Sequence, residues 1–163
     1  EDAVGEIKHF LNTPSVFQGV KKLVEENAEL GKQVEEGRKQ RAKAIREEIA
    51  RNMPESGGIH LVCRQVDLVP EIVRDIAFGL KQEFPDLALI LGSVVDGKPL
   101  LTVALGDETV GRGLHAGNIV REGPKRTGGG GGGHPFSARG GEKNAAGIEA
   151  AMLRAKRLVE EKL

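Results

Sequence analysis

The sequence contains no tryptophan, no tyrosine and only one cysteine, Cys63, among its 163 residues. A single cysteine excludes a disulfide within the chain, and its place in an apolar run predicts a buried thiol rather than a catalytic one. No apolar stretch reaches the length of a membrane span, about 18 residues, and there is no signal sequence. We therefore expect a cytoplasmic protein without a membrane partner.

The residue patterns of catalysis and of metal binding are also missing. The histidines His9, His60, His115 and His134 show no His-Glu-x-x-His spacing and no Cys-x-x-Cys partner, so the sequence predicts no zinc site. No nucleophile stands beside a base, and the Walker pattern Gly-x-x-x-x-Gly-Lys-Ser/Thr is absent. We interpret His60, in a predicted strand, as a structural residue. The chain is expected to bind a ligand without catalysing a reaction or holding a cofactor.

Charge is balanced over the whole chain but unevenly distributed. Residues 54–120 hold five basic and nine acidic side chains, a net charge of −4, whereas residues 121–163 hold nine and five, a net charge of +4. A neutral chain is not expected to bind nucleic acids in general. The basic C-terminal part nevertheless allows a local contact with phosphate.

Residues 1–53 are predicted to form a helical subdomain. A short helix over Val4–Leu11 is followed, after Asn12-Thr13-Pro14, by a long helix over Ser15–Asn52 that Pro14 or Ser15 can cap. Asn27 falls on an apolar stripe with 3- and 4-residue spacing, made by Val16, Val20, Leu23, Leu30 and Val34. This pattern favours a helical hairpin or a coiled coil in which Asn27 fixes the register. The charged faces are most simply solvated, with RNA contact as the alternative for Arg38, Lys39, Arg41 and Lys43.

Residues 54–163 are predicted to form a small α/β (α+β) domain, in which helices cover a mixed sheet. The boundary signal is the Pro- and Gly-rich stretch over residues 53–58. Strands are predicted over Ile59–Val66, Leu87–Val95 and Leu100–Leu105, and helices over Pro70–Phe84, Leu114–Arg121 and Asn144–Lys162. Asp96-Gly97 is a strong hairpin signal, and the continuous apolar run after Leu87 indicates a central strand.

Six consecutive glycines, Gly128–Gly133, followed by His134, are the most informative feature of the chain. Only 30 residues follow them, and a lone helix cannot bury its apolar face, so we predict an internal loop rather than a linker. Holding six glycines rigid costs on the order of 6–12 kcal/mol, which implies close approach of a ligand to the backbone. Bare N–H groups in succession can form an anion-binding nest, beside the positive end of the last helix. The candidate contacts are Lys125, Arg126, Gly128, Gly129, Gly130, Gly131, Gly132, Gly133, His134, Arg139 and Lys143.

Two strings in this region resemble a known family. Gly128–Ala138 (GGGGGGHPFSA) resembles the glycine-rich signature of the DHH-associated domain, and Leu114–Val120 (LHAGNIV) resembles the helix that precedes it. This domain occurs at the C-terminus of alanyl-tRNA synthetases and in DHH-family phosphodiesterases. The resemblance covers residues 57–163, and together with the charged helix the chain resembles the C-terminal domain of bacterial alanyl-tRNA synthetases.

The resemblance implies that the chain holds the outer elbow of a tRNA, with alanine tRNA as the expected partner, and assists aminoacylation and editing. By the match to the loop, tRNA contact falls on Gly128–Gly133 and His134, and more weakly on Arg139 and Lys143. The implied parent is an ATP-dependent alanine–tRNA ligase, in which ATP, magnesium and zinc belong to other domains. The helical part is expected to support a homodimer. The alternatives are the substrate-binding lobe of a DHH-family oligonucleotide phosphodiesterase and a module that only oligomerises.

Overall fold

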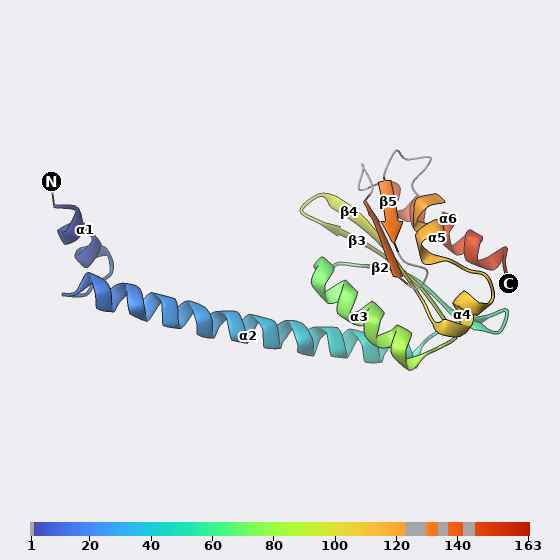
Figure 1. The fold of residues 1–163 in the computed structure, drawn as a ribbon, viewed down its shortest axis with the longest axis horizontal. Coiled ribbons are helices and arrows are strands. Elements are labelled where there is room, and N and C mark those ends of the chain that lie inside the picture. The colour runs from blue at the N-terminus through green and yellow to red at the C-terminus, as the bar shows by residue number, and fades with distance from the viewer. Residues whose placement is uncertain (1, 123–129, 134–136, 142–145) are drawn as a thin grey trace. The chain divides into compact units, whose positions relative to one another are not determined.

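The computed structural model describes residues 2–122, 130–133, 137–141 and 146–163. The chain divides into two compact units, Glu1–Gln40 and Arg41–Leu163. The predicted fold class is confirmed, because a helical segment is followed by a mixed sheet with helices packed against it (Figure 1).

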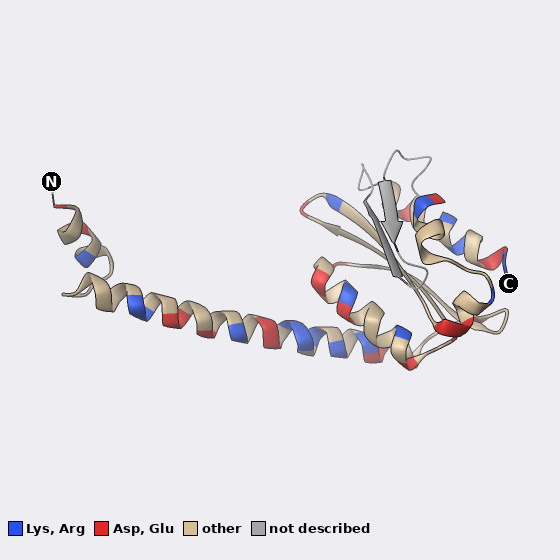
Figure 2. Ribbon diagram, viewed as in Figure 1, with Lys and Arg blue, Asp and Glu red and all other residues tan. Residues whose placement is uncertain are grey.

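The helical segment begins with α1 (Ala3–Phe10), and the 36-residue helix α2 (Val16–Arg51) follows. The Asp2 carboxylate accepts a hydrogen bond from the Gly5 N–H at 2.9 Å, and the Ser15 hydroxyl accepts one from the Gln18 N–H at 3.4 Å. Both contacts satisfy amide groups that a helix start leaves free, which confirms Ser15 as a cap of the long helix. Basic (Lys, Arg) and acidic (Glu) residues are interspersed along α2 (Figure 2).

The sheet has six strands in the order β1-β2-β3-β4-β6-β5. The strands are β1 (Glu55–Ser56), β2 (Ile59–Val66), β3 (Leu87–Val95), β4 (Lys98–Leu105), β5 (Gly130–Gly133) and β6 (Ser137–Gly141). The pair β2–β3 is parallel, and the other pairs are antiparallel. Leu87 to Leu91 are fully buried, so the predicted central strand is confirmed.

Local sequence accounts for the middle of this sheet. Pro70 opens α3 (Pro70–Glu83), and apolar residues at helical spacing bury one face of that helix. The β3–β4 hairpin turns at Asp96 and Gly97, whose φ angles are 52° and 72°. Two residues with positive φ match the right-handed twist of the flanking strands, as the Asp-Gly pair predicts.

Helices cover the two faces of the sheet (Figure 1). On one face, α3 and the end of α2 enclose a core that includes Ile49, Ile76 and Leu89. On the other face, α5 (Ala116–Glu122) and α6 (Gly147–Glu160) pack over residues such as Ile90 and Val103. The sequence did not predict β1, β5, β6 or the five-residue helix α4 (Asp107–Gly111), because each is short and depends on its neighbours.

Candidate nucleic-acid interface

The described part of the glycine run is a strand, where the sequence predicted a loop over Gly128–Gly133. Gly130–Gly133 form β5 and pair antiparallel with β6, with Gly132 opposite Arg139 and Gly133 opposite Ala138. Glycine has a low intrinsic tendency to form a strand, so β5 depends on its pairing with the neighbouring strand β6. Of the other candidate residues, Arg139 lies in β6, whereas Lys125, Arg126, Gly128, Gly129, His134 and Lys143 lie outside the described residues.

This correction changes the chemistry expected of the glycines. In an extended strand, successive N–H groups point to opposite sides, so Gly130–Gly133 do not form a nest. Alternate residues of an antiparallel edge strand direct their N–H and C=O groups away from the partner. No described strand pairs with the outer edge of β5, since it ends the sheet order. Some of the glycine N–H donors therefore pair with β6, and the others face the free edge of β5.

The glycine strand is held through β6 and α5. Leu101 of β4 pairs with Gly140, and Thr102 with Arg139, which joins β6 to the buried centre of the sheet. The short helix α5 contacts β4, β5 and β6. Ile119 and Val120 of α5 are buried in the core. The glycine edge is thus attached to the buried core of the domain.

A hydrogen bond ties the end of α5 to α6. Arg154 of α6 donates from Nε to the carbonyl oxygen of Glu122, the last residue of α5, at 2.8 Å. A guanidinium that donates to the last turn of a helix also opposes the negative end of its dipole. The same helix carries Lys156, which approaches Glu160 at 4.0 Å, and the exposed Arg157. The hydrogen bond between Arg154 and Glu122 holds the end of α5, from which the chain continues toward the glycines.

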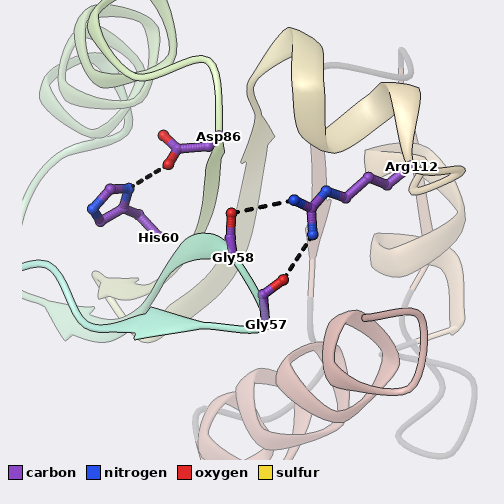
Figure 3. A network of polar contacts seen from close by, with 5 residues as sticks. All are labelled: Gly57, Gly58, His60, Asp86 and Arg112. Atoms are coloured by element: carbon purple, nitrogen blue, oxygen red, sulfur yellow. Dashed lines mark hydrogen bonds and ion pairs between the residues drawn. The ribbon is translucent and has the colours of Figure 1, made fainter.

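A second polar network secures the opposite end of the sheet (Figure 3). The Arg112 guanidinium donates to the carbonyl oxygens of Gly57 and Gly58, at 2.7 and 3.3 Å. Both glycines have positive φ, 58° and 80°, as the tight turn between β1 and β2 requires. No residue pattern identifies Arg112, because its partners are main-chain groups more than fifty residues away.

The interpretation of His60 as a structural residue is confirmed. Its Nδ1 lies 2.7 Å from Oδ2 of Asp86, and its backbone N–H donates to the Asp86 carbonyl oxygen at 2.9 Å. Its ring also lies 6.0 Å from that of Phe84, at a tilted angle. These contacts join the start of β2 to the start of β3 (Figure 3).

Cys63 is half-buried, and its Sγ lies 3.8 Å from the carbonyl oxygen of Met152. Burial raises the pKa of the Cys63 thiol, and the nearby Lys156 offsets only part of that effect. A raised pKa makes a thiol a poorer nucleophile near neutral pH. Among the described residues, no three His, Cys, Asp or Glu side chains gather as a metal site would require. In the same residues, no helix combines the length and apolar character needed to cross a membrane.

Comparisons with known proteins identify the family of this chain. The DHHA1 domain family matches residues 56–161, so the chain belongs to the DHHA1 family. The chain is 41% identical over 154 residues to the alanine–tRNA ligase of Bacteroides thetaiotaomicron, and 36% identical over 157 residues to that of Christiangramia forsetii. These matches cover 93% and 95% of the chain but only 18% of each relative, so the chain spans about a fifth of their length.

Solved structures share the fold. The C-Ala domain of Aquifex aeolicus alanyl-tRNA synthetase aligns with a TM-score of 0.59 at 24% identity, over 67% of this chain and 98% of that domain. A DHH-domain member of the s1p family of ribosomal proteins aligns with a TM-score of 0.52 at 16% identity, over 99% of this chain and 38% of that protein. At these identities the likeness concerns the fold alone.

Proposed function

We propose that this chain is the tRNA-binding C-terminal module of an alanine–tRNA ligase and contacts the elbow of the tRNA. Its family and its similarity to alanine–tRNA ligases over 93% of its length are the observations that carry the proposal. In the proposed parent enzyme, ATP, magnesium and zinc act in other domains. The module's part is to hold the tRNA for aminoacylation and editing.

The proposed RNA contact is the free edge of β5 together with the basic residues that flank the glycines in the sequence. Glycines leave main-chain donors open to a phosphate, because no side chain stands between them and the ligand. Lys125, Arg126, His134, Arg139 and Lys143 supply charge-assisted contacts in the proposal. A short glycine edge touches few phosphates, so affinity should fall only moderately with salt.

The test of elbow binding is a titration of the chain at several salt concentrations. Full-length alanine tRNA should bind more tightly than a minihelix that lacks the elbow, and more tightly than duplex DNA. Equal affinity for tRNA and minihelix would contradict the elbow contact. Binding that is tightest for duplex DNA would point to nonspecific electrostatic attraction.

Two sets of variants locate the contact. Lys125→Ala with Arg126→Ala should weaken tRNA binding by at least about tenfold and lower the salt slope by up to about two units. Lys21→Ala with Lys22→Ala removes the same charge from α2 and serves as the control. Gly131→Asp places a negative charge on the glycine edge, and Gly111→Asp makes the same change at an exposed position with open space around it. If the members of each pair have equal effects, the contact lies elsewhere.

Dimerisation is the second part of the proposal. The apolar stripe of α2 is proposed to associate with a second copy of the chain.

DHH-type oligonucleotide binding is less well supported, because the DHH-domain protein among the solved structures shares only 16% identity with this chain.

A further inference from the structure

The glycine strand β5 is supported by the short helix α5. Gly130–Gly133 have a low intrinsic tendency to form a strand, and α5 contacts both β5 and its partner β6. This helix has only seven residues, which is too short for a helix to be stable by itself in water. The contacts that hold α5 therefore also decide where the glycine edge lies.

One side of α5 is held by burial. Ala116, Ile119 and Val120 are buried, in the same core as Ala151 and Ala155 of α6. The two helices lie side by side (Figure 1). Apolar packing thus fixes the inner side of α5 against α6 and the sheet.

The last residue of α5 is held differently. Glu122 is only half-buried, and a hollow that is partly open to solvent is lined by Ile119 and Glu122 of α5 and by Leu158 of α6. The last four carbonyl groups of a helix have no partner within the helix. The carbonyl oxygen of Glu122 accepts a hydrogen bond from Nε of Arg154 at 2.8 Å. A charged donor makes a stronger bond than a neutral one, so Arg154 serves as a cap where apolar packing is incomplete.

The core of the domain places Arg154 for this contact. Ala151 and Ala155, which flank it on α6, are buried, so the backbone that carries Arg154 is fixed. Arg157, about one turn further along α6, is exposed. The same helix therefore carries one guanidinium that holds α5 and another that faces solvent, and the second supplies a matched control.

We propose that Arg154 is a positioning residue for RNA binding: by capping α5 it holds the glycine edge of β5 in place, without contacting the RNA itself. This inference rests on the proposed tRNA contact at that edge. Without the cap, the last turn of α5 frays and β5 loses support on one face. The affinity for RNA then falls in proportion to the fraction of molecules that keep the binding-competent arrangement.

Amide hydrogen exchange of the full 163-residue chain tests the positioning without RNA. Arg154→Met keeps much of the length of the side chain but removes the donor. Amides in the last turn of α5 and in Gly130–Gly133 should exchange at least about fivefold faster, whereas those of β2 and β3 should change less than about twofold. Arg154→Lys, which keeps a charged donor, should recover most of the protection. Arg157→Met removes the same charge from α6 and should leave all these rates unchanged.

Titration with full-length alanine tRNA tests the consequence for binding. Arg154→Met should lower the affinity by about five- to tenfold, with the slope of log affinity against log salt unchanged. Arg154→Lys should restore most of the affinity, and Arg157→Met should have no comparable effect. A residue that touches a phosphate would instead lower the slope by about 0.7–0.9 unit when it is removed.

Three results would overturn the positioning role. Unchanged exchange at Gly130–Gly133 would mean that Arg154 does not hold the strand. Equally accelerated exchange in β2 and β3 would mean that the variant loosens the whole domain. A lower salt slope with unchanged exchange would make Arg154 a direct RNA contact.

Failure of the proposed function gives a different result. If the unmodified chain binds tRNA no better than the minihelix, the elbow contact fails, and with it the role of Arg154 in that contact. The exchange rates still decide whether Arg154 holds the glycine strand, because they are measured without RNA.

Discussion

Two parts of the same helix, α2, differ in whether their apolar residues are buried. Ile49 is 3% exposed and Ala42 is 7% exposed, whereas Leu30 and Val34 are 58% and 55% exposed. Both parts place their apolar residues three or four positions apart. The difference is that α3 and the sheet cover the second part, whereas no described element buries the first. Helical spacing therefore predicts a face that needs covering, and the rest of the chain decides whether the cover is internal.

The largest expected effect comes from truncating one residue in each part. Ile49→Ala should lower the free energy of unfolding of the sheet domain by about 2–4 kcal/mol, because it opens a cavity in the core beneath α3. Leu30→Ala should change it by less than about 0.5 kcal/mol. Amide hydrogen exchange of β3 in urea, at concentrations where the chain is monomeric, measures both. Similar losses for both variants would show that the two parts do not differ in burial.

A pair of glycine substitutions sharpens the same contrast. A Cβ at Gly106 would collide with the carbonyl group of Pro85 and lie 2.7 Å from the Phe84 oxygen. Because backbone cannot move aside easily, Gly106→Ala should destabilise the sheet domain by about 2–3 kcal/mol. A Cβ at Gly31 meets nothing within 4 Å, so Gly31→Ala should stabilise the helix by about 1 kcal/mol. Thermal unfolding followed by circular dichroism should show opposite shifts, and a gain for Gly106→Ala would contradict the packing.

The smallest expected effect concerns thiol chemistry. Burial raises the pKa of Cys63 above its ordinary value of 9.0. The unfolded thiol therefore ionises first as pH rises, so the stability that Cys63 contributes is present below pH 9.0 and is lost as pH rises through the folded-state pKa. Cys63→Ala should flatten the decline in stability above that pH in urea titrations.

The reactivity of the Cys63 thiol can be compared with that of a cysteine introduced on the exposed surface of α2. At pH 8, Cys63 should react with a disulfide reagent at least tenfold more slowly than a cysteine at Lys22→Cys in the Cys63→Ala background. Equal rates would mean that Cys63 is as accessible as the α2 surface.

The structure matches the predicted elements where local patterns decide it. The strands β2 and β3 have the predicted bounds, and α3 begins at the predicted Pro70. The Asp96-Gly97 turn followed from residue types that tolerate positive φ. The expected tRNA contact at the glycines came from a family resemblance, and the DHHA1 match supports that family.

The structure departs from the predicted elements where a segment depends on a distant one. The strand β5 exists because β6 pairs with it, and β6 because β4 does, across about thirty residues. Arg112 closes the β1–β2 turn through main-chain oxygens, which no residue pattern reveals.

By itself, the sequence determined the helices other than the short α4, the central strands, the hairpin turn and the apolar stripe of α2, because periodicity, proline and positive-φ residues act over a few neighbouring positions. Only the tertiary structure decided that Ala42 and Ile49 are buried, and that four glycines form the edge of a sheet. Burial and strand pairing depend on groups brought together from far apart in the chain, and their free energy is gained only once those groups meet.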